Sequence, residues 1–219
     1  MKRITLTICA TTLLLIGCNS SSDDKTKTDT TPAADTSKKM TDAKTTTPPV
    51  SLDSATMMKN WMTCMTPGEM QKMMASWDGT WSADITMWEP GKPPAKTTGK
   101  AVNKMILGGR YQESVNTSTM MGMPFEGHGT LGYNNATKMF ENAWVDNMGT
   151  GVMNMKGPWD AATKTITLTG KGVDPGSMTE KEMRETLTVI DDKTQLMQMF
   201  GPGPDGKEMK MMEIKFSKK

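Results

Sequence analysis

The chain has 219 residues, of which 26 are basic, 24 are acidic and one is a histidine, so its formal net charge is only +2. A charge this small creates no long-range field that attracts nucleic acid, and we expect no nucleic-acid partner. If Cys9 leaves with a signal peptide and Cys18 is lipidated, only Cys64 and His128 remain, which are too few for a structural zinc site, and we expect no cofactor.

The first 18 residues have the layout of a secretory signal peptide. Residues 1–3 carry two positive charges, residues 4–16 form an apolar run, and Gly17 precedes Cys18. The run is shorter than the roughly 20 apolar residues that span a bilayer. A cysteine directly after Gly17 resembles the lipobox of bacterial lipoproteins. The resemblance implies cleavage after Gly17, and a diacylglyceryl thioether and an acylated amine on Cys18.

The lipid bilayer is therefore the first expected partner, reached through the acyl chains of Cys18. Removal of residues 1–17 takes away Lys2 and Arg3 and no acidic residue, which leaves 24 basic and 24 acidic residues. Because no polybasic stretch assists attachment, the acyl chains must provide it, and two or more chains anchor a protein stably. By resemblance to lipoprotein sorting, Asn19 favours the outer membrane of the cell envelope over the inner membrane.

Residues 18–50 are expected to form a tether behind the lipidated Cys18. Apart from Cys18, this stretch consists mainly of Ser, Thr, Asp, Lys, Pro and Ala, and five Asp balance five Lys. Such a composition cannot offset the entropy cost of folding, and it predicts disorder. A flexible chain of this length spans roughly 30 Å root-mean-square.

Residues 51–76 predict two short methionine-rich helices. Met58, Trp61, Met62 and Met65 are spaced as on one helix face, and a second set with this spacing starts at Met70. Thr66, Pro67 and Glu69 are predicted to begin the second helix, as N-cap, first helical residue and capping-box partner.

Residues 77–219 predict a mainly β domain. Apolar and polar residues alternate in short segments separated by turn residues, most clearly over 163–169, 186–190 and 212–216. Nine to ten strands at this spacing favour a single antiparallel barrel or sandwich. Cys64, which lies in the helical segment, is the one cysteine left after removal of Cys9 and lipidation of Cys18, so no intramolecular disulfide is expected.

Several motifs occur together in this domain and in the helix before it. They are residues 66–69, 77–81, 90–94, 105–111, 124–133, 144–150, 200–206 and 211–214. In this order they resemble the bacterial domain-of-unknown-function family numbered fifteen seventy-nine. The resemblance covers about residues 64–219 and implies a calycin-like (lipocalin-type) barrel. Gly79-Thr80-Trp81 matches the lipocalin Gly-x-Trp, whose tryptophan closes the barrel floor.

Methionine is the anomaly of the composition, with 25 residues. Met packs irregular apolar space, and core filling is one explanation. Its thioether also binds Cu(I), and reversible oxidation to the sulfoxide would make it an oxidant buffer. The clusters considered for a metal are Met120, Met121 and Met123 in a predicted loop, and Met62, Cys64 and Met65 in the first helix.

Candidate ligand-binding residues lie in the part of the chain where the motifs are densest. They are Trp81, Arg110, Glu126, His128, Tyr133, Trp144 and Asp146. Glu126 and His128 are two residues apart and share one face of a strand, where a carboxylate beside an imidazole can perform acid–base catalysis.

The sequence thus predicts a membrane-anchored envelope lipoprotein with a non-catalytic barrel that binds a small apolar ligand. One alternative is a Met-rich copper-binding or oxidant-buffering protein, and another is an enzyme that uses Glu126 and His128. A packed barrel that serves only in contacts with a protein partner is a further alternative, because fold does not determine function.

Overall fold

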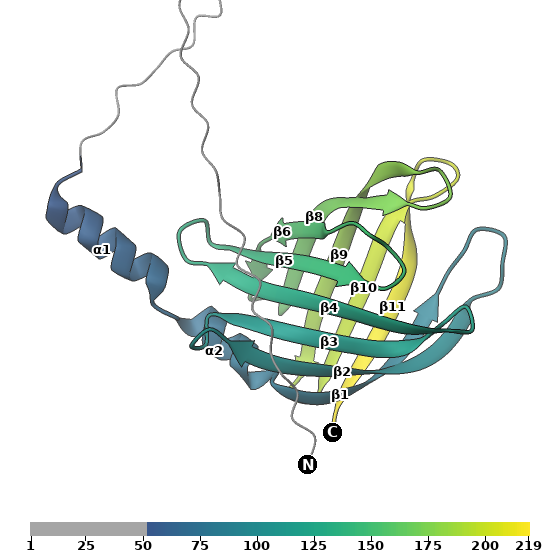
Figure 1. Cartoon of the computed structure of the whole chain (residues 1–219), viewed down its shortest axis with the longest axis horizontal. Helices are drawn as coiled ribbons and strands as arrows, with labels where there is room; N and C mark the ends of the chain where they lie inside the picture. Colours follow the sequence, from purple (N-terminus) through teal and green to yellow (C-terminus); the bar gives the residue numbers. More distant parts are fainter. Residues whose placement is uncertain (1–51) are drawn as a thin grey trace, which may run out of the picture. The chain divides into compact units, whose positions relative to one another are not determined.

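The structure, a computed structural model, describes residues 52–219 as two helices followed by a β-sheet (Figure 1). The predicted signal peptide, the Cys18 anchor and the tether lie outside these residues. Neither helix of the described part is long and apolar enough to cross a membrane.

The two helices differ in how they pack. Helix α1 (Ser54–Met65) is capped by Asp53, whose Oδ1 accepts a 2.9 Å hydrogen bond from the Thr56 N–H, and none of its residues is buried. Helix α2 (Glu69–Ser76) buries Gln71 and Met74. Of the two apolar stripes predicted from the sequence, only the second packs against the sheet.

The predicted start of the second helix is wrong by two residues. Thr66 ends α1 instead, because its N–H and its Oγ1 both donate to the Met62 carbonyl, at 3.0 and 2.7 Å. Helix α2 has Gly68 as its N-cap, and the Gly68 N–H donates to Gln71 Oε1 at 2.8 Å. A glutamine side chain therefore provides the cap that we expected from Thr66 and Glu69.

Eleven strands follow the helices, and every pairing between them is antiparallel. Their bounds are β1 Gly79–Met87, β2 Ala95–Ile106, β3 Tyr111–Met120, β4 Met123–Asn134, β5 Met139–Asp146, β6 Met153–Gly157, β7 Trp159–Asp160, β8 Thr165–Asp174, β9 Thr179–Asp191, β10 Thr194–Pro202 and β11 Glu208–Lys218. Consecutive strands pair from β1 to β6 and from β7 to β11, β1 also pairs with β11, and β6 pairs with β8. This closes a ten-stranded barrel, with the two-residue β7 beside it, and confirms the predicted fold.

Closure between β6 and β8 depends on glycine. A Cβ on Gly157 would lie 1.8 Å from the carbonyl oxygen of Thr167, and one on Gly170 would lie 2.3 Å from that of Asn154. No side chain fits at such a distance from a neighbouring backbone, and glycine in a strand commonly marks such a close approach. Gly157 and Gly170 thus allow β6 and β8 to approach closely where the two halves of the barrel meet.

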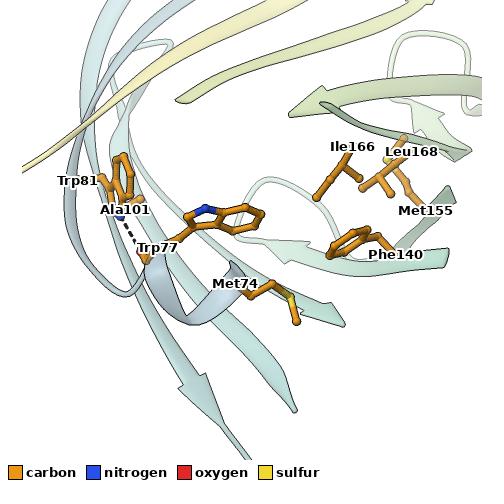
Figure 2. Close-up of a cluster of buried hydrophobic side chains, with 8 residues drawn as sticks. All are labelled: Met74, Trp77, Trp81, Ala101, Phe140, Met155, Ile166 and Leu168. Atoms are coloured by element: carbon orange, nitrogen blue, oxygen red, sulfur yellow. Dashed lines mark hydrogen bonds between the residues drawn. The ribbon is translucent and has the colours of Figure 1, made fainter. Parts of the chain in front are cut away.

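One end of the barrel is closed by a floor of buried side chains. Trp81 is 1% exposed, and its indole Nε1–H donates a 2.8 Å hydrogen bond to the Trp77 carbonyl. Figure 2 shows the Trp77 indole between Trp81 on one side and Phe140 and Ile166 on the other. Met74 is the residue of α2 that belongs to this buried cluster. The Gly-x-Trp tryptophan thus has the position that the family resemblance implies.

Candidate ligand-binding cavity

The barrel is hollow above its floor. A cavity of about 1470 Å³ is lined by the inner faces of the strands and, at the end opposite α2, by the loops between β5 and β6, β8 and β9, and β10 and β11. Cavities that bind small molecules commonly have about 300–1,000 Å³. The interior therefore has room for a ligand larger than a typical metabolite.

An aromatic wall on β4 and β5 owes its position to two glycines. The Trp144 indole lies flat over β4, where a Cβ on Gly127 would be 2.2 Å and one on Gly129 3.3 Å from its ring atoms. Its Nε1–H donates a 2.8 Å hydrogen bond to Asp146 Oδ2. Phe125 stacks on it at a centroid distance of 6.4 Å. Trp144 and Phe125 thus present a rigid apolar surface to the cavity.

Methionine dominates much of the remaining lining. Ten methionines line the cavity, namely Met120, Met148, Met153, Met178, Met183, Met197, Met199, Met209, Met211 and Met212. Within the described residues only Met74 and Met155 are buried in the core. Eight more are partly buried and pack against the core, namely Met70, Met73, Met87, Met105, Met153, Met183, Met197 and Met212. Core filling and cavity lining are therefore both roles of the methionines.

Polar side chains also line the cavity, and one group of them lies on β3. Ser114, Asn116 and Ser118 line the cavity from β3, and Asn116 Nδ2 donates a 2.9 Å hydrogen bond to Ser114 Oγ. Gln195 is only 4% exposed, and its Nε2 has no hydrogen-bond partner among the described residues. An unpaired buried amide costs roughly 1–3 kcal/mol.

Glu185 is the cavity group that sequence reasoning missed. Its register partners are Leu168 and Met199, both of which also line the cavity. No ion pair joins Glu185 to another described residue, and burial raises the pKa of its carboxyl to about 7. The segment around it is rich in charged residues, and the signal that could have found it is the alternation of Met183, Glu185 and Leu187 onto one face of the strand.

Four of the seven predicted site residues face the interior, and two of these line the cavity. Trp144 and Asp146 belong to its wall. Trp81 lies in the floor, and Tyr133 packs edge-on against Phe140 at a centroid distance of 5.0 Å next to the floor.

The other three residues lie on the outside of the barrel. Glu126 and His128 form a 2.9 Å pair, but their side chains are 57% and 45% exposed, because the inward positions of β4 are Gly127 and Gly129. Arg110 is exposed in the β2–β3 turn and donates to the nearby Leu107 carbonyl. The acid–base pair considered for catalysis therefore has no cavity around it.

The two methionine clusters considered for a metal are also largely exposed. Met62, Cys64 and Met65 lie on α1, which buries no residue, and Met121 and Met123 lie at the β3–β4 turn. Met120 alone among these six residues lines the cavity. Within residues 52–219 there is no group of three or more His, Cys, Asp or Glu side chains that could hold a metal ion.

A closed antiparallel barrel with a tryptophan floor and a hollow, methionine-lined interior places the protein among calycin-like barrels. The chain belongs to the family of proteins of unknown function DUF1579, whose model matches residues 66–218. This confirms the resemblance drawn from the sequence motifs.

The fold is also similar to a solved structure. The crystal structure of Rv2717c from M. tuberculosis matches with a TM-score of 0.53 and 12% sequence identity, covering 70% of this chain and 99% of the other. At this identity the likeness concerns the fold alone. We found no curated protein whose sequence matches the chain.

Proposed function

We propose that the protein is a lipid-anchored envelope protein whose barrel binds a small, mostly apolar ligand without catalysis. The observation that carries this proposal is the cavity of about 1470 Å³, closed by the Trp81 floor and open at the loop end. An aromatic wall and flexible methionines suit an adaptable apolar site.

Native mass spectrometry of the full chain, extracted from its own envelope without refolding, tests the ligand. We expect a retained organic mass that is displaced by excess anilinonaphthalene sulfonate. Ser118→Trp, which adds an indole inside the cavity, should reduce the retained mass, whereas Thr119→Trp on the outer face should leave it unchanged. A bare wild-type protein that also fails to bind the dye would contradict the proposal.

The anchor has its own test at Cys18. We expect that the full chain incorporates radiolabelled palmitate and sediments with membranes, and that Cys18→Ala loses the label, because the lipid requires the Cys18 sulfur. Cys64→Ala is the matched control, since Cys64 is an exposed free thiol on α1. Unchanged palmitate labelling in Cys18→Ala would show that the lipid is attached elsewhere, and no labelling of the parent would show that it is not attached.

A further inference from the structure

We propose that the mouth of the barrel holds a binding site for a soft monovalent metal ion, Cu(I), formed by the thioether sulfurs of Met183, Met211 and Met153. The three methionines belong to the lining of the cavity described above, so the ion would be a second ligand of that cavity, besides the apolar one. The site differs from both clusters that the sequence indicated.

Two of the three sulfurs converge on one point of the inner wall. A Cβ placed on Gly201 would lie 2.6 Å from the Met211 Sδ and 3.0 Å from the Met183 Sδ. Both sulfurs therefore lie within a few ångströms of each other, although they come from β11 and β9. Gly201 lies on β10, between those two strands, and its missing side chain leaves the room that they occupy. Strands β9, β10 and β11 lie side by side in Figure 1.

A β-bulge explains why Met211 reaches this point. Met199 pairs with Met212 and the next residue, Phe200, pairs with Lys210, so Met211 is an extra residue without a partner on β10. Bulges bend a strand and redirect a side chain. Met211 and Met212, although consecutive, consequently both line the cavity.

Met153 supplies the third sulfur from the other side. A Cβ on Gly172 would be 3.2 Å from Met183 Cγ and 3.5 Å from the Met153 Sδ. Met183 therefore borders the space above both glycines, which it shares with Met211 at Gly201 and with Met153 at Gly172. The glycines below it, Gly172 and Gly201, act as Gly127 and Gly129 do below Trp144, because each leaves space for a large side chain on the inner wall.

The chemistry of this group selects the ion. Neutral thioethers are soft ligands and select Cu(I) over hard cations such as Mg²⁺ and Ca²⁺. On the inward face of β9, Met183 lies between Lys181 and Glu185, all three of which line the cavity.

The test is anaerobic titration of the full chain with Cu(I) in competition with a chromophoric chelator. Serine replaces all three cysteines, so that no thiol contributes. We expect one ion per chain with sulfur scattering in its X-ray absorption spectrum. Met183→Leu/Met211→Leu should lose this ion, while its urea unfolding curve without metal stays close to that of the parent, since Leu and Met have similar volumes.

Met120→Leu/Met123→Leu is the matched control at the β3–β4 turn, and we expect it to bind Cu(I) as the parent does. No Cu(I) binding by the parent would overturn the proposal. So would binding that survives Met183→Leu/Met211→Leu, or binding that disappears only in the control, because the ion would then lie at another methionine cluster.

Discussion

Replacing Trp81 by alanine is expected to lower the free energy of unfolding by about 3–5 kcal/mol, the range for a large aromatic removed from a core. The side chain is almost completely buried, and its neighbours come from α2 and from both halves of the barrel, so they cannot close around the space that it leaves. The substitution also removes the donor to the Trp77 carbonyl. Urea unfolding followed by far-UV circular dichroism measures the change.

Two further variants test which property of Trp81 stabilises the fold. One keeps most of the ring and removes the hydrogen bond, and the other removes a tryptophan at a different place in the barrel. Trp81→Phe keeps most of the ring volume and loses the indole N–H, so we expect a smaller loss, of which about 1 kcal/mol belongs to the hydrogen bond. Trp88→Ala removes a half-buried indole at the mouth of the barrel and should cost less than Trp81→Ala. Equal losses at Trp81 and Trp88 would contradict the view that the floor is the main core of the barrel.

Replacing Glu185 by glutamine is expected to remove a fall in stability between mildly acidic and neutral pH. Burial raises the pKa of this carboxyl from 4.5 to about 7. Below about pH 4.5 the group is protonated in both the folded and the unfolded chain. As pH rises from there to about 7, the unfolded chain loses the proton while the folded chain keeps it, so the free energy of unfolding falls. Above about pH 7 both states are ionised and the loss is complete.

The size of this effect is bounded by the shift in pKa. It cannot exceed about 3 kcal/mol, and we expect about 1–2 kcal/mol, because Glu185 keeps some exposure toward the cavity, where water can solvate it. Urea unfolding at about pH 5 and pH 8 measures the difference in Glu185→Gln and in the parent. Glu182→Gln, with an exposed side chain on the same strand, should keep the parental difference. A parental chain whose stability does not fall over this range would show that Glu185 is solvated.

The fold was largely predictable because its signals are local. Alternating segments and turn residues predicted an antiparallel barrel, and Gly79-Thr80-Trp81 located the floor. The cavity was not predictable, because its volume depends on which side chains meet across the barrel. His128 and Glu126 illustrate this difference, since their shared face followed from the period of two, whereas its outward direction followed only from closure of the sheet.

The site was harder to predict for a related reason. Glu185 lies in a charged segment and Met211 at a bulge, so local pattern placed neither of them in the interior. The two glycines beneath Trp144 had no visible role until the indole was seen to lie over them. In each case a contact between strands decides the role of the residue.

A lining of unbranched thioether side chains gives the cavity walls that can change shape. Each methionine has three rotatable side-chain bonds and can adapt its conformation to ligands of different shapes. The barrel would therefore select ligands by volume and polarity more than by exact shape. The same atoms are chemically convertible. Oxidation of the lining sulfurs to sulfoxides would make an apolar interior polar. Oxidant exposure would then lower the affinity of the cavity for an apolar ligand, and reduction of the sulfoxides would restore that affinity.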